Sequence, residues 1–176
     1  MSSMPLPSIS SEDVQSLRRT LFTDAQPVAV RHQPLSGKPL QECFSIVAQL
    51  VALCGGSQVF GWAIFEIPGI WLEAEFHTVW ESPDGSLFDV TPRPFELDEI
   101  LFLPDPARRY EGIQVATVFH PLTQNSAVLR HIQLARELFI ERNRGELAFA
   151  SSYEQTPRMS AIQAEMDRLE QQFPFP

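Results

Sequence analysis

The sequence contains little cysteine, little positive charge and no long apolar run. Its 176 residues include 2 Cys, and 13 Lys and Arg stand against 22 Asp and Glu, giving a formal net charge of −9. Two cysteines are too few for a disulfide framework, and no Cys-x-x-Cys pair suggests structural zinc. The acidic balance argues against nucleic acid or an anionic membrane as partner. No stretch is long and apolar enough to span a bilayer.

Signals for export and for cofactors are also lacking. Residues 1–8 have neither the positive region nor the apolar core of a secretory signal, so we expect a cytoplasmic protein, with export by a signal-less route left open. Gly55-Gly56 is typical of a helix end and not of a phosphate loop, because no strand precedes it and no Lys-Ser/Thr follows. We therefore expect no cofactor.

What is present predicts one α+β domain with a helical extension. Residues 1–10 are rich in Ser and Pro and are typical of a flexible tail. Residues 11–123 would form the core, and residues 124–176 a C-terminal helical region. Apolar stripes on helices expected at 126–143 and 157–172 must be covered, either by the core, by a protein partner or by a second copy of the chain.

Within the core, apolar spacing and turn residues predict alternating helices and strands. We expect helices over 11–22, 40–54 and 95–103, and strands over 27–32, 58–66, 70–81, 86–91 and 113–120. The strands after the 40–54 helix are joined by Pro-Gly turns, which favour an antiparallel sheet.

The two cysteines occupy opposite ends of the 40–54 helix. Cys43 lies in its first turn, where the helix dipole stabilises an anion, whereas Cys54 lies beside the unpaired carbonyls of the last turn. A thiolate nucleophile needs the first of these environments and a histidine within reach. Taken alone, a cysteine in an apolar helix is typical of core packing.

His77 and Asp89 are predicted to meet on one face of the sheet. If residues 83–85 form a three-residue hairpin loop, Ser82 pairs with Ser86, and Asp89 then lies diagonal to His77 on its side of the strands. A carboxylate in that place accepts the imidazole N–H and fixes its tautomer. Cysteine, histidine and aspartate in this order and on these elements bring the catalytic interpretation level with that of three separate packing residues.

The order of these residues resembles the transglutaminase-like branch of papain-type folds. The resemblance rests on two motifs, His77-Thr-Val-Trp-Glu and Asp89-Val-Thr-Pro. The spacing from Cys43 to His77 and on to Asp89 is similar to that of arylamine N-acetyltransferases. The likeness covers residues 38–92. Gln41-Glu-Cys-Phe replaces the usual Gly-Gln-Cys-Trp, and no Arg-Gly-Gly precedes the cysteine. The resemblance implies a nucleophile-bearing helix packed on an antiparallel sheet.

The expected activity is that of a cysteine-dependent hydrolase or an acyl or amide transferase, acting on a peptide, a glutamine side chain or a small acyl group. Cys43 would be the nucleophile, His77 the base and then the acid, and Asp89 the orienting carboxylate. The Cys43 backbone N–H would hold the oxyanion with a second donor, for which Gln41 and Gln58 are candidates. Trp80 is a candidate wall of the substrate groove, although tryptophan in such a sheet is more often core.

Two other interpretations remain open. One is a non-catalytic protein-binding adaptor of the same fold, docking through its acidic surface and C-terminal helices. The other is a divalent-metal site built on Glu75, His77 and Asp89, although no ligand spacing is diagnostic, and we expect no metal. His32, His120 and His131 carry no motif.

Overall fold

The computed structural model describes residues 6–40, 42–145 and 155–174. Their elements follow in the order α1 (Glu12–Thr20), β1 (Val28–His32), α2 (Cys43–Cys54), β2 (Ser57–Ile67), β3 (Trp71–Glu81), β4 (Leu87–Asp89), β5 (Glu99–Pro104), β6 (Val118–Pro121), α3 (Ser126–Arg142) and α4 (Pro157–Glu170). The fold is thus mixed α+β, as expected. No helix of the described ranges is long and apolar enough to cross a membrane.

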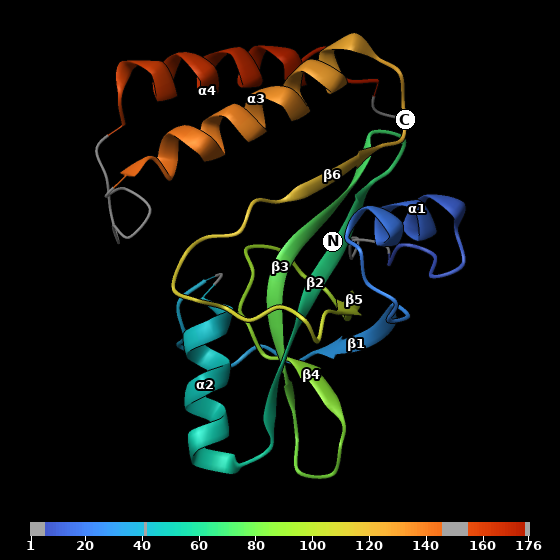
Figure 1. The fold of residues 1–176 in the computed structure, drawn as a ribbon, viewed down its shortest axis with the longest axis vertical. Coiled ribbons are helices and arrows are strands. Elements are labelled where there is room, and N and C mark those ends of the chain that lie inside the picture. Colours follow the sequence, from blue (N-terminus) through green and yellow to red (C-terminus); the bar gives the residue numbers. More distant parts are fainter. Residues whose placement is uncertain (1–5, 41, 146–154, 175–176) are drawn as a thin grey trace.

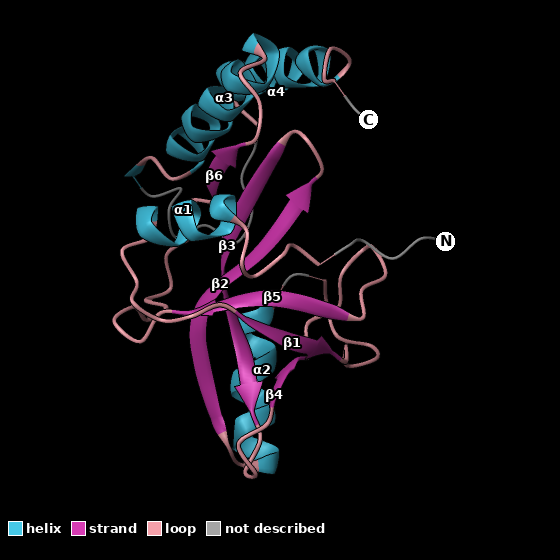
Figure 2. Cartoon of the chain, turned by 90° about the vertical axis from the view of Figure 1, so that its right-hand side faces the viewer, coloured by secondary structure: helices cyan, strands magenta, loops and turns pink. Residues whose placement is uncertain are grey.

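Five strands close into a small barrel in the order β2-β5-β1-β4-β3, because β3 pairs again with β2, and β6 extends the sheet beside β3 (Figure 2). The antiparallel pairing expected for the strands after the 40–54 helix is found between β2 and β3 and between β3 and β4, whereas β1 and β4 pair in parallel. Side chains of alternating positions fill the interior, among them Val30, Ala63, Val79 and Phe102.

The helix expected over 95–103 is wrong, and the strand β5 occupies Glu99–Pro104 instead. Four consecutive apolar side chains of β5, residues 100–103, are all buried, because the strand lies between β1 and β2 with one face inside the barrel and the other under α1. A short continuous apolar run fits a doubly buried strand as well as a buried helix.

Barrel closure depends on a glycine. Gly61 of β2 lies opposite His77 of β3 on one side and Pro104 of β5 on the other. A Cβ at this position would overlap with the Leu103 carbonyl oxygen and lie 2.7 Å from Cζ of Phe102. The close approach of β2 to β5 therefore requires a residue without a side chain.

The predicted helix starts are largely confirmed by their caps. The side chains of Ser11, Asn125 and Thr156 accept backbone N–H groups at the starts of α1, α3 and α4. The helix expected from residue 40 begins later, at Cys43. The strand expected over 113–120 is shorter, covering only Val118–Pro121.

The two C-terminal helices lie side by side across the end of the long β2–β3 hairpin, as Figure 1 shows. The apolar stripe of α4, with Met159, Ile162 and Met166, packs on Leu134 and Leu138 of α3 within the same chain. The helix pair contacts the hairpin through Ile70 and Trp71. The apolar stripe of α4, for which the sequence predicted a cover without identifying it, is therefore covered by α3 of the same chain.

Candidate active site

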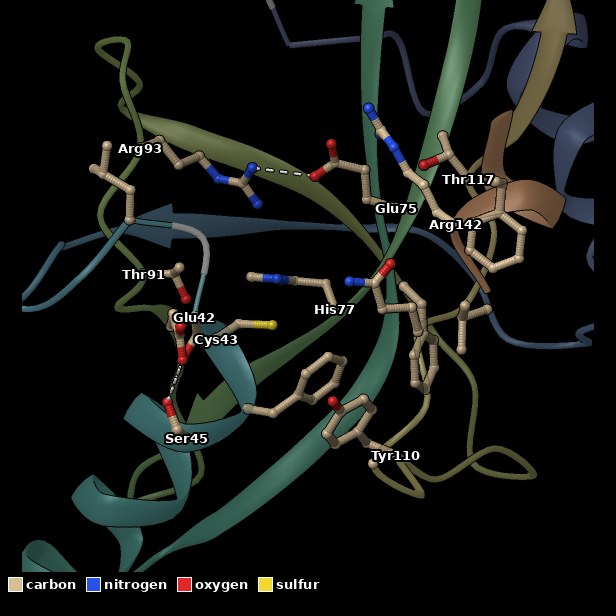
Figure 3. Close-up of a pocket in the computed structure, with 17 residues that line it drawn as sticks. Glu42, Cys43, Ser45, Glu75, His77, Thr91, Arg93, Tyr110, Thr117 and Arg142 are labelled. Atoms are coloured by element: carbon tan, nitrogen blue, oxygen red, sulfur yellow. Dashed lines mark hydrogen bonds and ion pairs between the residues drawn. The ribbon is translucent and has the colours of Figure 1, made fainter. Parts of the chain in front are cut away.

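Cys43 is the first residue of α2, so its backbone N–H lies at the positive end of the helix. The helix is anchored by Ile46 and Val47, which pack on Val90 beyond β4. Cys43 is 5% exposed, and its side chain points toward His77 (Figure 3). Cys54, at the other end of α2, is exposed.

His77 lies between the cysteine and the aspartate. Its Nε2 is 3.0 Å from Oδ1 of Asp89, and since a carboxylate only accepts, Nε2 carries the proton. Nδ1 is then the ring nitrogen that remains for the thiol. Burial alone would lower the pKa of His77, but the Asp89 carboxylate, with a smaller contribution from Cys43, raises it from 6.5 to about 9. The imidazole is therefore protonated at neutral pH.

Asp89 is fully buried and holds several donors at once. Its Oδ1 also accepts the backbone N–H of Thr91 at 3.2 Å. Its Oδ2 lies 3.1 Å from Nδ1 of His32 and 3.6 Å from Nε of Arg93. Burial would raise the pKa of Asp89, but His77, His32 and Arg93 hold it well below its usual range. The carboxylate stays ionised.

His32 and Arg93 are the site residues that sequence reasoning missed. Arg93, with a side chain only 3% exposed, also lies 3.3 Å from Oε2 of Glu75 and 4.6 Å from the ring centre of Phe65. His32 ends β1, and only the parallel pairing with β4 brings it beside Asp89. No local pattern around His32 signals that pairing, whereas the four-residue spacing of Asp89 and Arg93 is a weak signal in the sequence.

A cavity of about 840 Å³ opens in front of Cys43 and His77. Thr91, Arg93 and Glu75 line one side of the cavity (Figure 3). Residues of the segment that precedes β6, Gln114 and Thr117 among them, also line it. The floor is aromatic, since Tyr110 stacks flat on Phe44 with ring centres 3.9 Å apart. The site is thus an open, partly charged pocket beside a thiol and an imidazole.

This cavity continues toward the C-terminal helices. A second cavity of about 240 Å³ shares Gln114, Thr117, Phe139 and Arg142 with the first, and it reaches Gln163 and Met166 of α4. The space before Cys43 therefore has a smaller neighbouring cavity, with the four shared residues between them.

Two of the other predicted site residues, Gln58 and Trp80, lie away from the cavity wall. Gln58 donates its amide to the Phe44 carbonyl oxygen at 3.2 Å, and Trp80 donates to the Gly55 carbonyl oxygen at 3.0 Å while its ring packs on Phe88. Neither lines the cavity, so both act structurally, as donors that fix the two ends of α2. Gln41 lies outside the described residues.

The metal interpretation receives no support from the side chains. Within residues 6–40, 42–145 and 155–174, no group of three or more His, Cys, Asp and Glu is arranged to hold a metal ion. The guanidinium of Arg93 lies between Glu75 and Asp89 and forms an ion pair with each of them. A cation of the protein already occupies the place that the metal would need.

Comparison of the chain with protein-family models, curated proteins and solved structures finds no match.

Proposed function

We propose that the protein is a cysteine-dependent hydrolase or acyl transferase in which Cys43, His77 and Asp89 are the catalytic triad. The observation that carries this proposal is the alignment of three groups from three elements: a thiol at a helix N-terminus, aimed at an imidazole whose far nitrogen is bonded to a buried carboxylate. Helix, strand and strand follow in the order that the transglutaminase-like resemblance implies.

The charge state of His77 sets its first role. Because its pKa is about 9, His77 is an imidazolium at neutral pH, placed beside the sulfur of Cys43. A cysteine nucleophile reacts as its thiolate, and a neighbouring imidazolium is the counter-charge for that form. The thiolate attacks the substrate carbonyl carbon and forms a C–S bond. His77 then acts as the acid, giving its proton to the leaving nitrogen as the C–N bond breaks.

The second half-reaction reverses the proton transfer. Water or an acceptor amine attacks the thioester, His77 takes the proton of that nucleophile, and the C–S bond breaks to return the thiolate. The developing oxyanion would be held by the Cys43 backbone N–H, and Gln114 replaces Gln58 as our candidate for the second donor because it lines the cavity. Asp89 keeps the imidazole oriented throughout.

The shape of the cavity supports a polypeptide as the acyl donor. A small acyl group would need only the space beside Cys43, whereas a second cavity lies next to it and is lined by residues of α3 and α4. An extended chain presenting a backbone or glutamine amide to Cys43 would fill both parts.

The test uses the two cysteines as each other's control. Cys54→Ser leaves Cys43 as the only thiol, and Cys43→Ala leaves the exposed Cys54 as an ordinary reference at a helix C-terminus. We expect iodoacetamide to modify Cys43 at least about tenfold faster than Cys54 at pH 6, where an ordinary thiol is almost wholly protonated. His77→Ala should remove that advantage.

A second measurement separates reactivity from catalysis. p-Nitrophenyl acetate should acetylate Cys43, as seen by intact mass, and the acetyl group should then be lost to water in the wild type. His77→Asn should slow both steps. A Cys43 that reacts no faster than Cys54, and that is never acetylated, would contradict the enzyme proposal and favour the binding module.

A further inference from the structure

We propose that His32 is a positioning residue that holds the Asp89 carboxylate in the orientation from which it bonds His77. The inference rests on the proposed function, since it assigns a role to a neighbour of the triad. It concerns a residue that is not among those lining the cavity in front of Cys43.

The two oxygens of the Asp89 carboxylate bond to two different imidazoles, those of His77 and His32. Oδ1 of Asp89 lies 3.0 Å from Nε2 of His77, and Oδ2 lies 3.1 Å from Nδ1 of His32. Because a carboxylate cannot donate, each of these nitrogens carries a proton. The His32 side chain is 4% exposed, so little water competes for its bond.

The backbone fixes His32 independently of this bond. His32 is paired in register with Asp89 across the parallel β1–β4 ladder. Its own N–H donates to the Asp98 carbonyl oxygen at 2.8 Å, and the N–H of Gln33 donates to the Asp89 carbonyl oxygen, also at 2.8 Å. The imidazole thus extends from a main chain that is bonded on both sides, which makes it a rigid donor.

The neighbouring charges show why such a donor is needed. Arg93 lies 3.6 Å from the same Oδ2, and its guanidinium is a fork that binds carboxylates through both oxygens. Without His32, Arg93 would be free to take the whole carboxylate and turn Oδ1 away from His77. His32 occupies Oδ2, Thr91 donates its N–H to Oδ1, and Glu75 draws Arg93 in the other direction.

The chemistry of the bond defines a pair of matched variants. In His32→Asn, the amide nitrogen takes the position of Nδ1 and keeps a donor at Oδ2, whereas in His32→Leu the donor is lost at similar size. His32→Gln moves the donor one bond further along the side chain. His120→Leu is the control, because His120 pairs at the surface with Asp13, away from the triad.

The experiment measures the alkylation of Cys43 by iodoacetamide at pH 6 in the Cys54→Ser background. We expect His32→Leu to slow it about tenfold, the loss that follows when a charged group gives up a buried hydrogen bond. His32→Asn should stay within about threefold of the parent for the same reason, and His120→Leu should match the parent. The downfield proton NMR signal of the His77 Nε2–H should move upfield in His32→Leu and stay in place in His32→Asn.

Equal rates and an unmoved His77 signal in His32→Leu would overturn the inference and leave the proposed function standing. If His32→Leu does not fold, the comparison uses His32→Asn and His32→Gln. Cys43 alkylation that is as slow in a folded His32→Asn as in His32→Gln would equally contradict the inference. A parent Cys43 no faster than Cys54 would remove both the proposed function and the role of His32. A shifted NMR signal with slow, Asn-rescued alkylation supports the inference.

Discussion

Trp80 lies directly opposite Phe88 across the β3–β4 pair. Counting outward from this pair, Ser82 meets Ser86, and the Ser82 N–H donates to the Ser86 carbonyl oxygen at 2.9 Å. Counting inward, Asp89 stands one residue beyond Phe88, diagonal to His77. A register shifted by one residue would turn Asp89 to the other face, so this pairing holds the imidazole and the carboxylate together.

The first prediction concerns the pH dependence of stability. The pKa of His77 is raised from 6.5 to about 9, so the folded state holds this proton more tightly than the unfolded chain does. The stabilisation is complete below pH 6.5 and is lost as pH rises toward 9. Urea unfolding of Cys43→Ala, which has no thiol at position 43 to release a proton on folding, should show the free energy of unfolding falling by about 3 kcal/mol across that range.

The matched variants are His77→Gln and His120→Gln. The first should lose the fall between pH 6.5 and 9, because it removes the proton whose affinity changes on folding. The second should keep the fall, since His120 lies at the surface beside Asp13. A His77→Gln protein with the same slope as the wild type would show that another group is responsible.

A second prediction concerns Glu73. Burial, with the neighbouring Glu75 adding to it, raises the pKa of Glu73 from 4.5 to about 7. The ionised Glu73 carboxylate therefore destabilises the folded state. This destabilisation is absent below pH 4.5 and fully present above pH 7. Glu73→Gln should raise the free energy of unfolding at pH 8 by up to about 3 kcal/mol and change it little at pH 4.

The control for Glu73 is Glu75→Gln, which breaks the contact with Arg93 and should not stabilise the protein. Chemical denaturation of both variants at pH 4 and 8 separates the two cases. Equal gains in both variants would mean that reducing net negative charge, and not the burial of Glu73, is what stabilises the protein.

The third prediction tests barrel closure at Gly61. Gly61→Ala should lower stability by about 3 kcal/mol, because the new methyl group overlaps the backbone of β5 and the ring of Phe102. The control is Gly69→Ala in the β2–β3 turn, where φ is +72° but nothing lies within 4 Å. That change should cost only about 1 kcal/mol from backbone strain. Thermal melting of the two variants measures both losses of stability, and equal losses would contradict the role of Gly61 in barrel closure.

Local signals in the sequence predicted the parts of the site that lie close along the chain. The Pro-Asp-Gly turn at residues 83–85 fixed the register of β3 and β4, and the apolar run after residue 40 placed Cys43 near a helix start. The short segment from Trp71 to Glu81 alternates strictly enough to place His77 on the face of Val79.

Contacts between distant segments were not predictable in the same way. His32 and Asp89 are 57 residues apart and meet through a parallel pairing that no turn encodes. The strand β5 was mistaken for a helix because its apolar run has no alternation to read. Residue type alone makes Gln58 a candidate oxyanion donor and Trp80 a candidate wall of the substrate groove, whereas backbone carbonyls at the two ends of α2 are their partners.

The closed order of the strands also has a kinetic consequence. Cys43, His77, Asp89 and His32 come from four elements, and β1 joins the barrel only by pairing with β4 and β5 much later in the chain. Contacts of such long sequence separation form slowly, because the loop between them must close first. During refolding, Cys43 would remain an ordinary thiol until the last strands pair. Pulsed alkylation of this one residue would therefore report the moment at which the barrel closes.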